Sequence, residues 1–198
     1  LTLSLDGRPV LVDPGTWLYG SGGPWRDWFR STAAHNTLTV EGVSQSLISG
    51  NFNWSHKAEA TLDDYSATPE LRLRAHHDGY LKRFGVVHER TLAIDGDALT
   101  FTDRLRGGTR SAEIVLQLAP GLKTRCHGCT AEVLADGKLL MEIVFPDGLV
   151  SFASGGDTPG KGGWVSPRFG IRVPAVRLVW RGEIGDAGVI TRLIPHRA

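Results

Sequence analysis

The chain has 198 residues, which is long enough to bury a substantial core within one domain. Its 22 lysines and arginines nearly balance its 21 aspartates and glutamates, so no overall positive field exists to hold a nucleic acid or an anionic membrane. No apolar run approaches the roughly 20 residues that a membrane-spanning helix needs. We therefore expect a single domain over residues 1–198, without a nucleic-acid partner and without a membrane span.

The first segment, residues 1–13, alternates apolar and polar side chains on either side of Asp6 and Gly7. These two residue types tolerate positive φ angles, so the segment predicts a β-hairpin that turns at this point. The alternation begins at Leu1 with no methionine before it. We expect the chain to be a piece of a longer protein.

Residues 14–36 and 154–170 are two long segments without a strand pattern, and long irregular segments in compact domains tend to be functional. The first is rich in aromatic residues and arginines. Indole faces stack on sugar rings and guanidinium groups pair with carboxylates, which makes Trp25, Trp28 and Arg30 candidates for binding an acidic sugar. The other interpretation is that the aromatic side chains form a satellite core beneath the loop.

His35 and Asn36 lie where this loop becomes a strand. Residues 37–41 alternate polar and apolar side chains with β-branched residues, and Gly42 follows, which predicts a half-buried strand ending in a turn. A lone histidine at such an entrance is either part of a site or simply satisfied by a loop carbonyl.

Most of the remaining chain alternates with a period near two residues, and no segment has a convincing amphipathic helix pattern. The strand-like segments are residues 57–64, 70–77, 86–95, 98–106, 111–119, 131–136, 138–145, 149–154, 175–182 and 188–195. Asp-Gly turns at 95–97, 136–137 and 147–148 favour tight hairpins between neighbouring strands. More than ten short strands of this kind predict an all-β fold, a large antiparallel β-sandwich of two packed sheets.

Cys126 and Cys129 form a CxxC sequence without the further ligands that a zinc site needs and without the βαβ setting of a redox pair. We expect a structural pair, either a local disulfide or two free thiols in a turn.

Motifs along nearly the whole chain, in order, resemble those of the heparinase II/III-like family. The most specific are D-P-G at residues 13–15 and R-S-T-x-A-H-N-T at residues 30–37. The others are HHDGY (76–80), HERTL (88–92), DRLRG (103–107), LAPG (118–121) and the closing residues 163–180. The resemblance implies the β-sandwich that follows a helical (α/α) toroid in polysaccharide lyases, which cleave heparin, heparan sulfate or alginate-type polymers by β-elimination.

The resemblance also implies roles for particular residues. His35 would be the catalytic histidine that the sandwich donates to a cleft between the domains, with Asn36 orienting the strand entrance and Arg30 facing the substrate carboxylate. Tyr80 would bind the sugar or transfer a proton, although a tyrosine there can equally be a packing residue. Glu41 stands where the family pattern favours aspartate, a change at a strand end.

Some relatives hold a metal ion, commonly zinc. His35, His77, Asp78 and His88 have the appropriate ligand chemistry, but their spacing does not diagnose a site. We expect no required cofactor, and a structural zinc ion stays open as an option.

The leading hypothesis is therefore the C-terminal domain of a polysaccharide lyase, with an acidic polysaccharide and the upstream toroid of the same protein as its partners. The alternative is a non-catalytic carbohydrate-binding or structural sandwich. A zinc hydrolase is a poorer third reading, because no compact ligand motif such as HExxH is present. The resemblance further implies the periplasm or cell envelope of a bacterium, and an isolated domain without activity.

Overall fold

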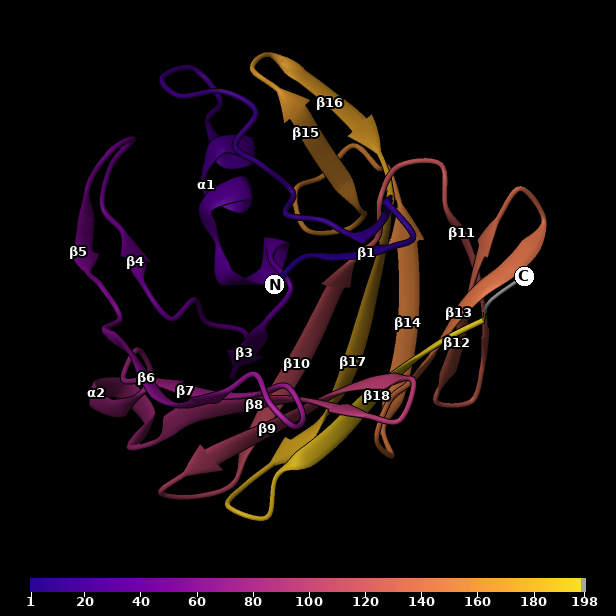
Figure 1. The fold of residues 1–198 in the computed structure, drawn as a ribbon. Helices are drawn as coiled ribbons and strands as arrows, with labels where there is room; N and C mark the ends of the chain where they lie inside the picture. Colours follow the sequence, from indigo (N-terminus) through magenta and orange to yellow (C-terminus); the bar gives the residue numbers. More distant parts are fainter. Residues whose placement is uncertain (197–198) are drawn as a thin grey trace.

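The computed structural model describes residues 1–196 and consists mainly of two antiparallel sheets packed against each other (Figure 1). The larger sheet has the strand order β11-β12-β13-β18-β9-β8-β7-β6, and the smaller has the order β14-β17-β10-β3. The predicted all-β sandwich is confirmed. Among these described residues, no helix is long and apolar enough to cross a membrane.

The elements follow one another closely along the chain. The larger sheet contains β6 (Ala60–Ser66), β7 (Arg72–His77), β8 (Val87–Asp95), β9 (Ala98–Arg106), β11 (Lys123–His127), β12 (Thr130–Ala135), β13 (Lys138–Val144) and β18 (Val189–Pro195). The smaller sheet contains β3 (Leu38–Val40), β10 (Arg110–Gln117), β14 (Leu149–Ser154) and β17 (Val176–Ile184). Three separate hairpins are β1 (Leu3–Leu5) with β2 (Arg8–Leu11), β4 (Leu47–Ile48) with β5 (Trp54–His56), and β15 (Trp164–Arg168) with β16 (Ile171–Pro174). The helical elements are α1 (Pro24–Arg30), the 3-10 turn η1 (Thr32–Ala34) and α2 (Leu81–Phe84).

The hairpin turns follow from residues that adopt positive φ angles. Asp6 and Gly7 have φ angles of 48° and 79° between β1 and β2, and Asp136 and Gly137 have 52° and 80° between β12 and β13. Consecutive positive φ values match the twist of paired strands, so both predicted hairpins form. The prediction for residues 147–148 is wrong, because this turn leads from β13 in the larger sheet to β14 in the smaller one.

The core lies between the two sheets. Leu116 and Leu178 from the smaller sheet and Phe101, Met141 and Leu193 from the larger one are fully buried in a single cluster. Each such side chain contributes roughly 1.5–3 kcal/mol by leaving water. This cluster therefore fixes the two sheets as one body.

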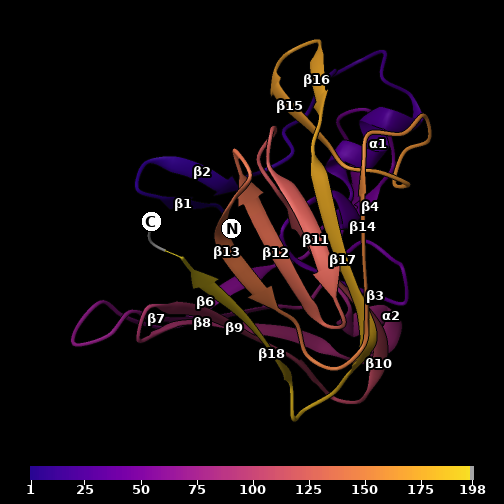
Figure 2. The same ribbon diagram turned by 90° about the vertical axis from the view of Figure 1, so that its right-hand side faces the viewer.

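Short elements gather beyond one end of the smaller sheet, with α1 between the β4–β5 hairpin and the β15–β16 hairpin (Figure 1). The turned view shows β15 and β16 extending past the end of β17 (Figure 2). The expectation that residues 14–36 and 154–170 lack regular structure is wrong in part, because α1 and β15 form there. Helix α1 begins at Pro24, a residue suited to a first helical position, but its seven residues are too few to show a periodic pattern.

Strand β3 differs from its prediction in length and burial. It covers Leu38–Val40, and all three side chains are buried rather than alternating. The chain then turns at Glu41 and Gly42, which have φ angles of 51° and 68°. The buried strand holds His35 and Asn36 next to the edge of the smaller sheet, where β3 pairs with β10.

Candidate functional site

A small pocket of about 190 Å³ opens beside His35. Its walls come from the end of α1, from η1, from the residues before β3, and from the β4–β5 hairpin with the segment that leads into it. The lining residues are Arg30, Thr32, His35, Thr37, Gln45, Ser46 and Trp54. All of its polar groups are thus contributed within 25 residues of sequence, so the pocket is built locally on top of the sheet.

Both ring nitrogens of His35 are hydrogen-bonded. Nδ1 lies 2.7 Å from Oδ2 of Asp13, and Nε2 lies 3.1 Å from the carbonyl oxygen of Phe29. A carboxylate and a carbonyl both accept, so the ring makes both bonds only as an imidazolium that donates twice. The hydrogen bond from His35 holds the pKa of Asp13 below its ordinary value. The pair keeps the ring in one orientation with about a third of its side chain exposed.

Asp13 is itself fixed by the turn that follows it. Its Oδ1 accepts the backbone N–H of Gly15 at 2.9 Å, the pattern of an Asx turn. The sequence motif D-P-G carried this information, but it served only as a family signature and gave Asp13 no role. Asp13 is the functional candidate that sequence reasoning missed, since pairing with His35 depends on a contact 22 residues apart.

Asn36 is buried and joins the segments that carry Asp13 and His35. Its Nδ2 donates to the carbonyls of Leu1 and Val12 at 2.8 and 2.9 Å, and its Oδ1 accepts the N–H of Gln117 at 2.6 Å. With 4% of its surface exposed and both polar atoms engaged, Asn36 offers no group to a sugar. Its position corrects the substrate-binding expectation and agrees with the expected orienting role.

Arg30 reaches the same pocket from the last turn of α1. Its guanidinium carbon lies 4.4 Å from the ring centre of Trp54, and its Nη1 and Nη2 donate to the carbonyls of Gly50 and Asn53 at 2.7 and 3.2 Å. These contacts hold the cation at the pocket wall. No sequence signal indicated Trp54, which reaches this place only through the β4–β5 hairpin.

Trp25 and Trp28 belong to a satellite aromatic cluster rather than to the His35 pocket. Trp28 and Phe29 are buried, and Trp17, Trp25 and Trp164 pack around them. The guanidinium carbon of Arg172 on β16 lies 3.8 Å from the ring centre of Trp25 and stacks on two further indoles. Both tryptophans therefore belong to a core beneath the aromatic loop, which is the second interpretation that the sequence left open. Their packing corrects the expectation of a direct sugar contact at Trp28, whose side chain is almost fully covered.

Tyr80 lies in the main core and not at a rim. It is fully buried, its hydroxyl donates to the carbonyl of Leu38 at 3.0 Å, and burial raises its pKa well above the ordinary value. The packing alternative therefore applies to this residue, and the expectation that it binds sugar is not supported by its place in the fold.

The structure brings together His77 and His88 but not the other metal candidates. Nε2 of His77 lies 3.0 Å from Nδ1 of His88, and Nε2 of His88 lies 2.7 Å from Oδ1 of Asp103. Asp78 instead accepts the N–H of Glu59 at 2.8 Å, and His35 contacts the carboxylate described above.

A metal ion does not fit these residues. Nδ1 of His77 faces the N–H of Gly79 at 3.2 Å, so each ring nitrogen of His77 and His88 already has a hydrogen-bond partner. Burial lowers the pKa of His77 to about 3, with the neighbouring His88 adding to the effect. Among the side chains that the structure describes, no three histidine, cysteine or acidic groups lie together so as to hold a metal. His77, His88 and Asp103 therefore form a hydrogen-bonded network in which each ring nitrogen already has a partner.

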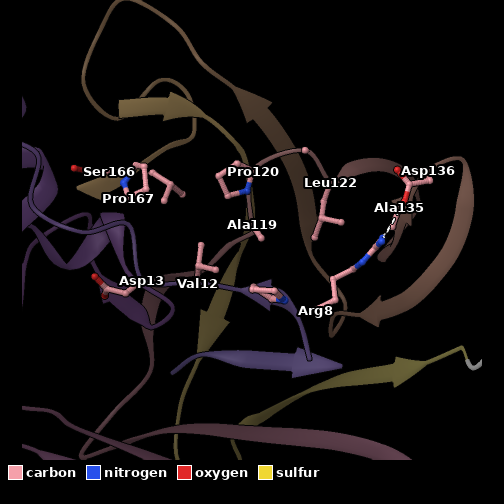
Figure 3. Close-up of a pocket in the computed structure, with 13 residues that line it drawn as sticks. Arg8, Val12, Asp13, Ala119, Pro120, Leu122, Ala135, Asp136, Ser166 and Pro167 are labelled. Atoms are coloured by element: carbon pink, nitrogen blue, oxygen red, sulfur yellow. Dashed lines mark hydrogen bonds and ion pairs between the residues drawn. The ribbon is translucent and has the colours of Figure 1, made fainter. Parts of the chain in front are cut away.

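Asp13 also borders a second, wider cavity, about 620 Å³ in volume (Figure 3). Apolar residues such as Val12, Ala119 and Leu122 line its middle, and Arg8 forms an ion pair of 3.1 Å with Asp136 at the end away from Asp13. The contact between Asp13 and His35 therefore links this cavity to the smaller pocket.

The two cysteines are free thiols, with Cys126 on β11 and Cys129 in the turn between β11 and β12. Burial raises the pKa of Cys126, which makes its thiolate less available. The expectation of a structural pair agrees with this placement, in its free-thiol form.

Comparison with solved structures gives a consistent set of relatives. A heparan sulfate lyase HepC from Pedobacter heparinus matches with a TM-score of 0.75 and 18% identity over 100% of this chain and 30% of that chain. A mutant of the same lyase gives a TM-score of 0.76 at 18% identity, with the same two coverages. A heparinase III with methylated lysines gives 0.74 at 17% identity, over 100% of this chain and 29% of that chain.

These likenesses show the fold, and the chain spans about a third of the length of each relative. No curated protein matches significantly. The sequence matches the family model described as "Heparinase II/III-like, C-terminal" over residues 1–190. Since this match covers nearly all of the sequence, the chain belongs to the heparinase II/III-like C-terminal domain family.

Proposed function

We propose that the chain is the C-terminal sandwich of a polysaccharide lyase that cleaves uronate-containing acidic polysaccharides, of the heparan sulfate or alginate kind, by β-elimination. Family membership and the names of the solved relatives support a lyase. Because those relatives are about three times longer, the proposal includes an upstream helical toroid that completes the active site.

The reaction needs three groups. A base removes the proton at C5 of the uronate, a positive group neutralises its carboxylate, and an acid protonates the leaving oxygen at C4. The described pocket offers an imidazole and a guanidinium, His35 and Arg30, but no tyrosine. We therefore assign the base and the leaving-group acid to the toroid, and carboxylate neutralisation to His35.

The observation that carries this assignment is the ring of His35 at a pocket wall, held by hydrogen bonds at both nitrogens. Asp13 holds Nδ1, while Nε2–H points to the carbonyl of Phe29 at the longer distance of 3.1 Å. Catalytic hydrogen bonds are often made only in the substrate complex. In the complex, Nε2–H exchanges the Phe29 carbonyl for the substrate carboxylate, a stronger acceptor whose charge grows toward the enolate-like state.

The test is the formation of unsaturated uronate, followed by its ultraviolet absorbance. The complete protein should cleave the polymer, the His35→Ala variant should lose about 10² to 10⁴ in kcat, and substrate binding should weaken much less. The 198-residue chain alone should be inactive. Turnover by this chain alone would contradict the two-domain site, and an unchanged kcat in the variant would return His35 to a packing role.

A second candidate function is a non-catalytic carbohydrate-binding sandwich. It is favoured by the observation that both ring nitrogens of His35 are already satisfied within the domain. Under this alternative, the complete protein binds polysaccharide without producing unsaturated uronate. In either case, we propose that no metal is required, and that the protein acts in the periplasm or envelope of a bacterium, an assignment that rests on the resemblance alone.

A further inference from the structure

Three exposed aromatic side chains meet at the end of the molecule that carries the His35 pocket. Tyr19, Phe52 and Phe169 are 53%, 67% and 65% exposed and form what we call the outer aromatic patch. The ring of Tyr19 stacks on Phe169 with 5.4 Å between centres and lies 6.5 Å from Phe52. Three separate loops supply these residues, so their meeting is a product of the fold and not of local sequence.

A buried cation lies against this patch. The guanidinium carbon of Arg26 is 5.5 Å from the ring centre of Tyr19 and 6.0 Å from that of Phe52, and the side chain is 7% exposed. Its Nε is buried without a hydrogen-bond partner in the described structure. Asp27 on the same helix offsets part of this charge but does not form an ion pair with it.

The patch continues the wall of the His35 pocket. Arg26 and Arg30 are four residues apart on α1 and so share one face of the helix. Arg26 donates to the carbonyl of Asn51 at 3.3 Å, and Arg30 donates to that of Gly50. The two cations therefore bind adjacent carbonyls at the tip of the β4–β5 hairpin, one beside Phe52 and the other beside Trp54.

The charge of Arg26 and Arg30 and the exposed rings of the outer aromatic patch indicate what kind of molecule binds here. Neither Arg26 nor Arg30 forms an ion pair with a carboxylate among the side chains that the structure describes, so their charge attracts an anionic partner. Exposed aromatic faces suit the apolar faces of pyranose rings and are a poor match for a second charged protein surface. An acidic polysaccharide carries both anionic groups and apolar pyranose faces, and both recur at regular intervals.

We propose that the outer aromatic patch is a distal sugar subsite, which holds units of the same acidic polysaccharide beyond those in the His35 pocket. This inference rests on the proposed function. A chain that runs along α1 contacts Arg30 and Trp54 first and then the patch, so only long substrates reach it.

The experiment compares heparan sulfate chains of two lengths, a tetrasaccharide and a chain of about sixteen sugars. In the complete protein, the double variant Phe52→Ser/Phe169→Ser should raise the KM of the long chain about tenfold more than that of the tetrasaccharide, because two stacking contacts are removed. The control is Tyr65→Ser/Phe152→Ser, which removes two exposed aromatic side chains on β6 and β14. It should leave the ratio of the two KM values unchanged.

Equal effects on both lengths, or no effect on either, would overturn the subsite. A lower unfolding temperature of the complete protein with equal losses on both substrates would assign the patch to contact with the upstream domain instead. If the complete protein cleaves neither substrate, the proposed function fails separately. In that case, the affinities of the 198-residue domain for the tetrasaccharide and for the longer chain are measured by calorimetry. The subsite requires that Phe52→Ser/Phe169→Ser weaken binding of the longer chain more than binding of the tetrasaccharide.

Discussion

At the scale of single residues, the central feature is that Asp13 determines how His35 is presented. The carboxylate accepts from Nδ1 at 2.7 Å and is held in place by its own turn. A charge-assisted hydrogen bond of this kind contributes more than a neutral one and fixes both the ring orientation and the nitrogen that faces substrate. Asp13 therefore acts as a positioning residue under the proposed mechanism.

Replacing this carboxylate should lower turnover without preventing binding. In the complete protein, we expect Asp13→Asn to reduce kcat about ten- to a hundredfold, the equivalent of roughly 1.5–3 kcal/mol for one charge-assisted bond, with a small change in KM. The matched control is Asp136→Asn, an exposed carboxylate at the other end of the same cavity.

A spectroscopic signature separates positioning from simple destabilisation. The imidazole ¹⁵N and ¹H signals of His35 should show a strongly hydrogen-bonded Nδ1 proton in the parent domain, and this signal should disappear in Asp13→Asn while persisting in Asp136→Asn. A variant that keeps full kcat, or one that loses activity with an unchanged Nδ1 proton signal, would contradict the positioning role.

The structure places His35 and Arg30 at one pocket, whereas Tyr80, Asn36 and Trp28, also expected to bind substrate, are buried. The difference has a physical origin. Amphipathic side chains such as tyrosine, asparagine and tryptophan are equally suited to a rim and to a buried position with a satisfied polar atom. Only the tertiary contacts decide between the two, and Asn36 and Tyr80 both bind backbone carbonyls that lie far away in sequence.

At the scale of elements, three adjacent strands of the larger sheet are joined by a buried polar chain. It runs from His77 on β7 through His88 on β8 to Asp103 on β9, and Arg90 closes it with two hydrogen bonds to Asp103 at 2.7 and 2.9 Å. Burial alone would raise the pKa of Asp103, but the charge of Arg90 and the bond from His88 hold it well below its ordinary value. Arg90 also donates to the carbonyl of Asn36 at 2.9 Å, which ties this network to the strand that presents His35.

This network predicts a loss of stability in mild acid. The pKa of His77 is 6.5 when unfolded and about 3 when folded, so between these values the unfolded chain binds the extra proton. The contribution of His77 to the free energy of unfolding should therefore be fully present above pH 6.5. It should fall as the pH drops toward 3, by up to roughly 1.4 kcal/mol per pH unit. His77→Gln, which can still donate to His88, should reduce that slope.

The measurement is urea unfolding of the 198-residue domain at several pH values. His127→Gln, which replaces an exposed histidine of β11, is the control for the loss of a histidine side chain. An unchanged slope in His77→Gln would show that the protonation of His77 is not what weakens the fold in acid.

The sequence predicted elements well where the local pattern is sufficient. The alternation of residues 131–136 predicts a strand, β12 covers Thr130–Ala135, and the expected turn at Asp136 and Gly137 follows it. Helix α1 and strand β15 were missed, since the first has seven residues and the second follows a glycine-rich segment. Both form through contacts made by distant residues, such as Arg172 on the indoles of Trp25 and Trp164.

At the scale of the whole molecule, stability is divided between two hydrophobic clusters. The main cluster lies between the sheets, and the satellite cluster lies among α1, η1 and the β15–β16 hairpin. Arg177 on β17 connects them, because its Nε donates to the carbonyl of Ala33 at 3.1 Å and its Nη1 approaches that of Gly160 at 3.4 Å. The loops that carry the site are thus fixed to the sandwich through a few polar contacts and one small aromatic cluster.

This division predicts two levels of protection in amide hydrogen exchange. The amides of β10 and β17, in the middle of the smaller sheet, should exchange by global unfolding, whereas those of α1 and β15–β16 should exchange faster by local opening of the satellite cluster. Trp25→Ala removes the indole that contacts three other aromatic rings and Arg172. It should weaken the satellite cluster by about 2–3 kcal/mol, which speeds exchange there by about 30- to 150-fold and leaves β10 and β17 nearly unchanged. If exchange in β10 and β17 accelerates as much as in α1, the two clusters unfold as one unit, and the site cannot adjust to a substrate without the sandwich itself opening.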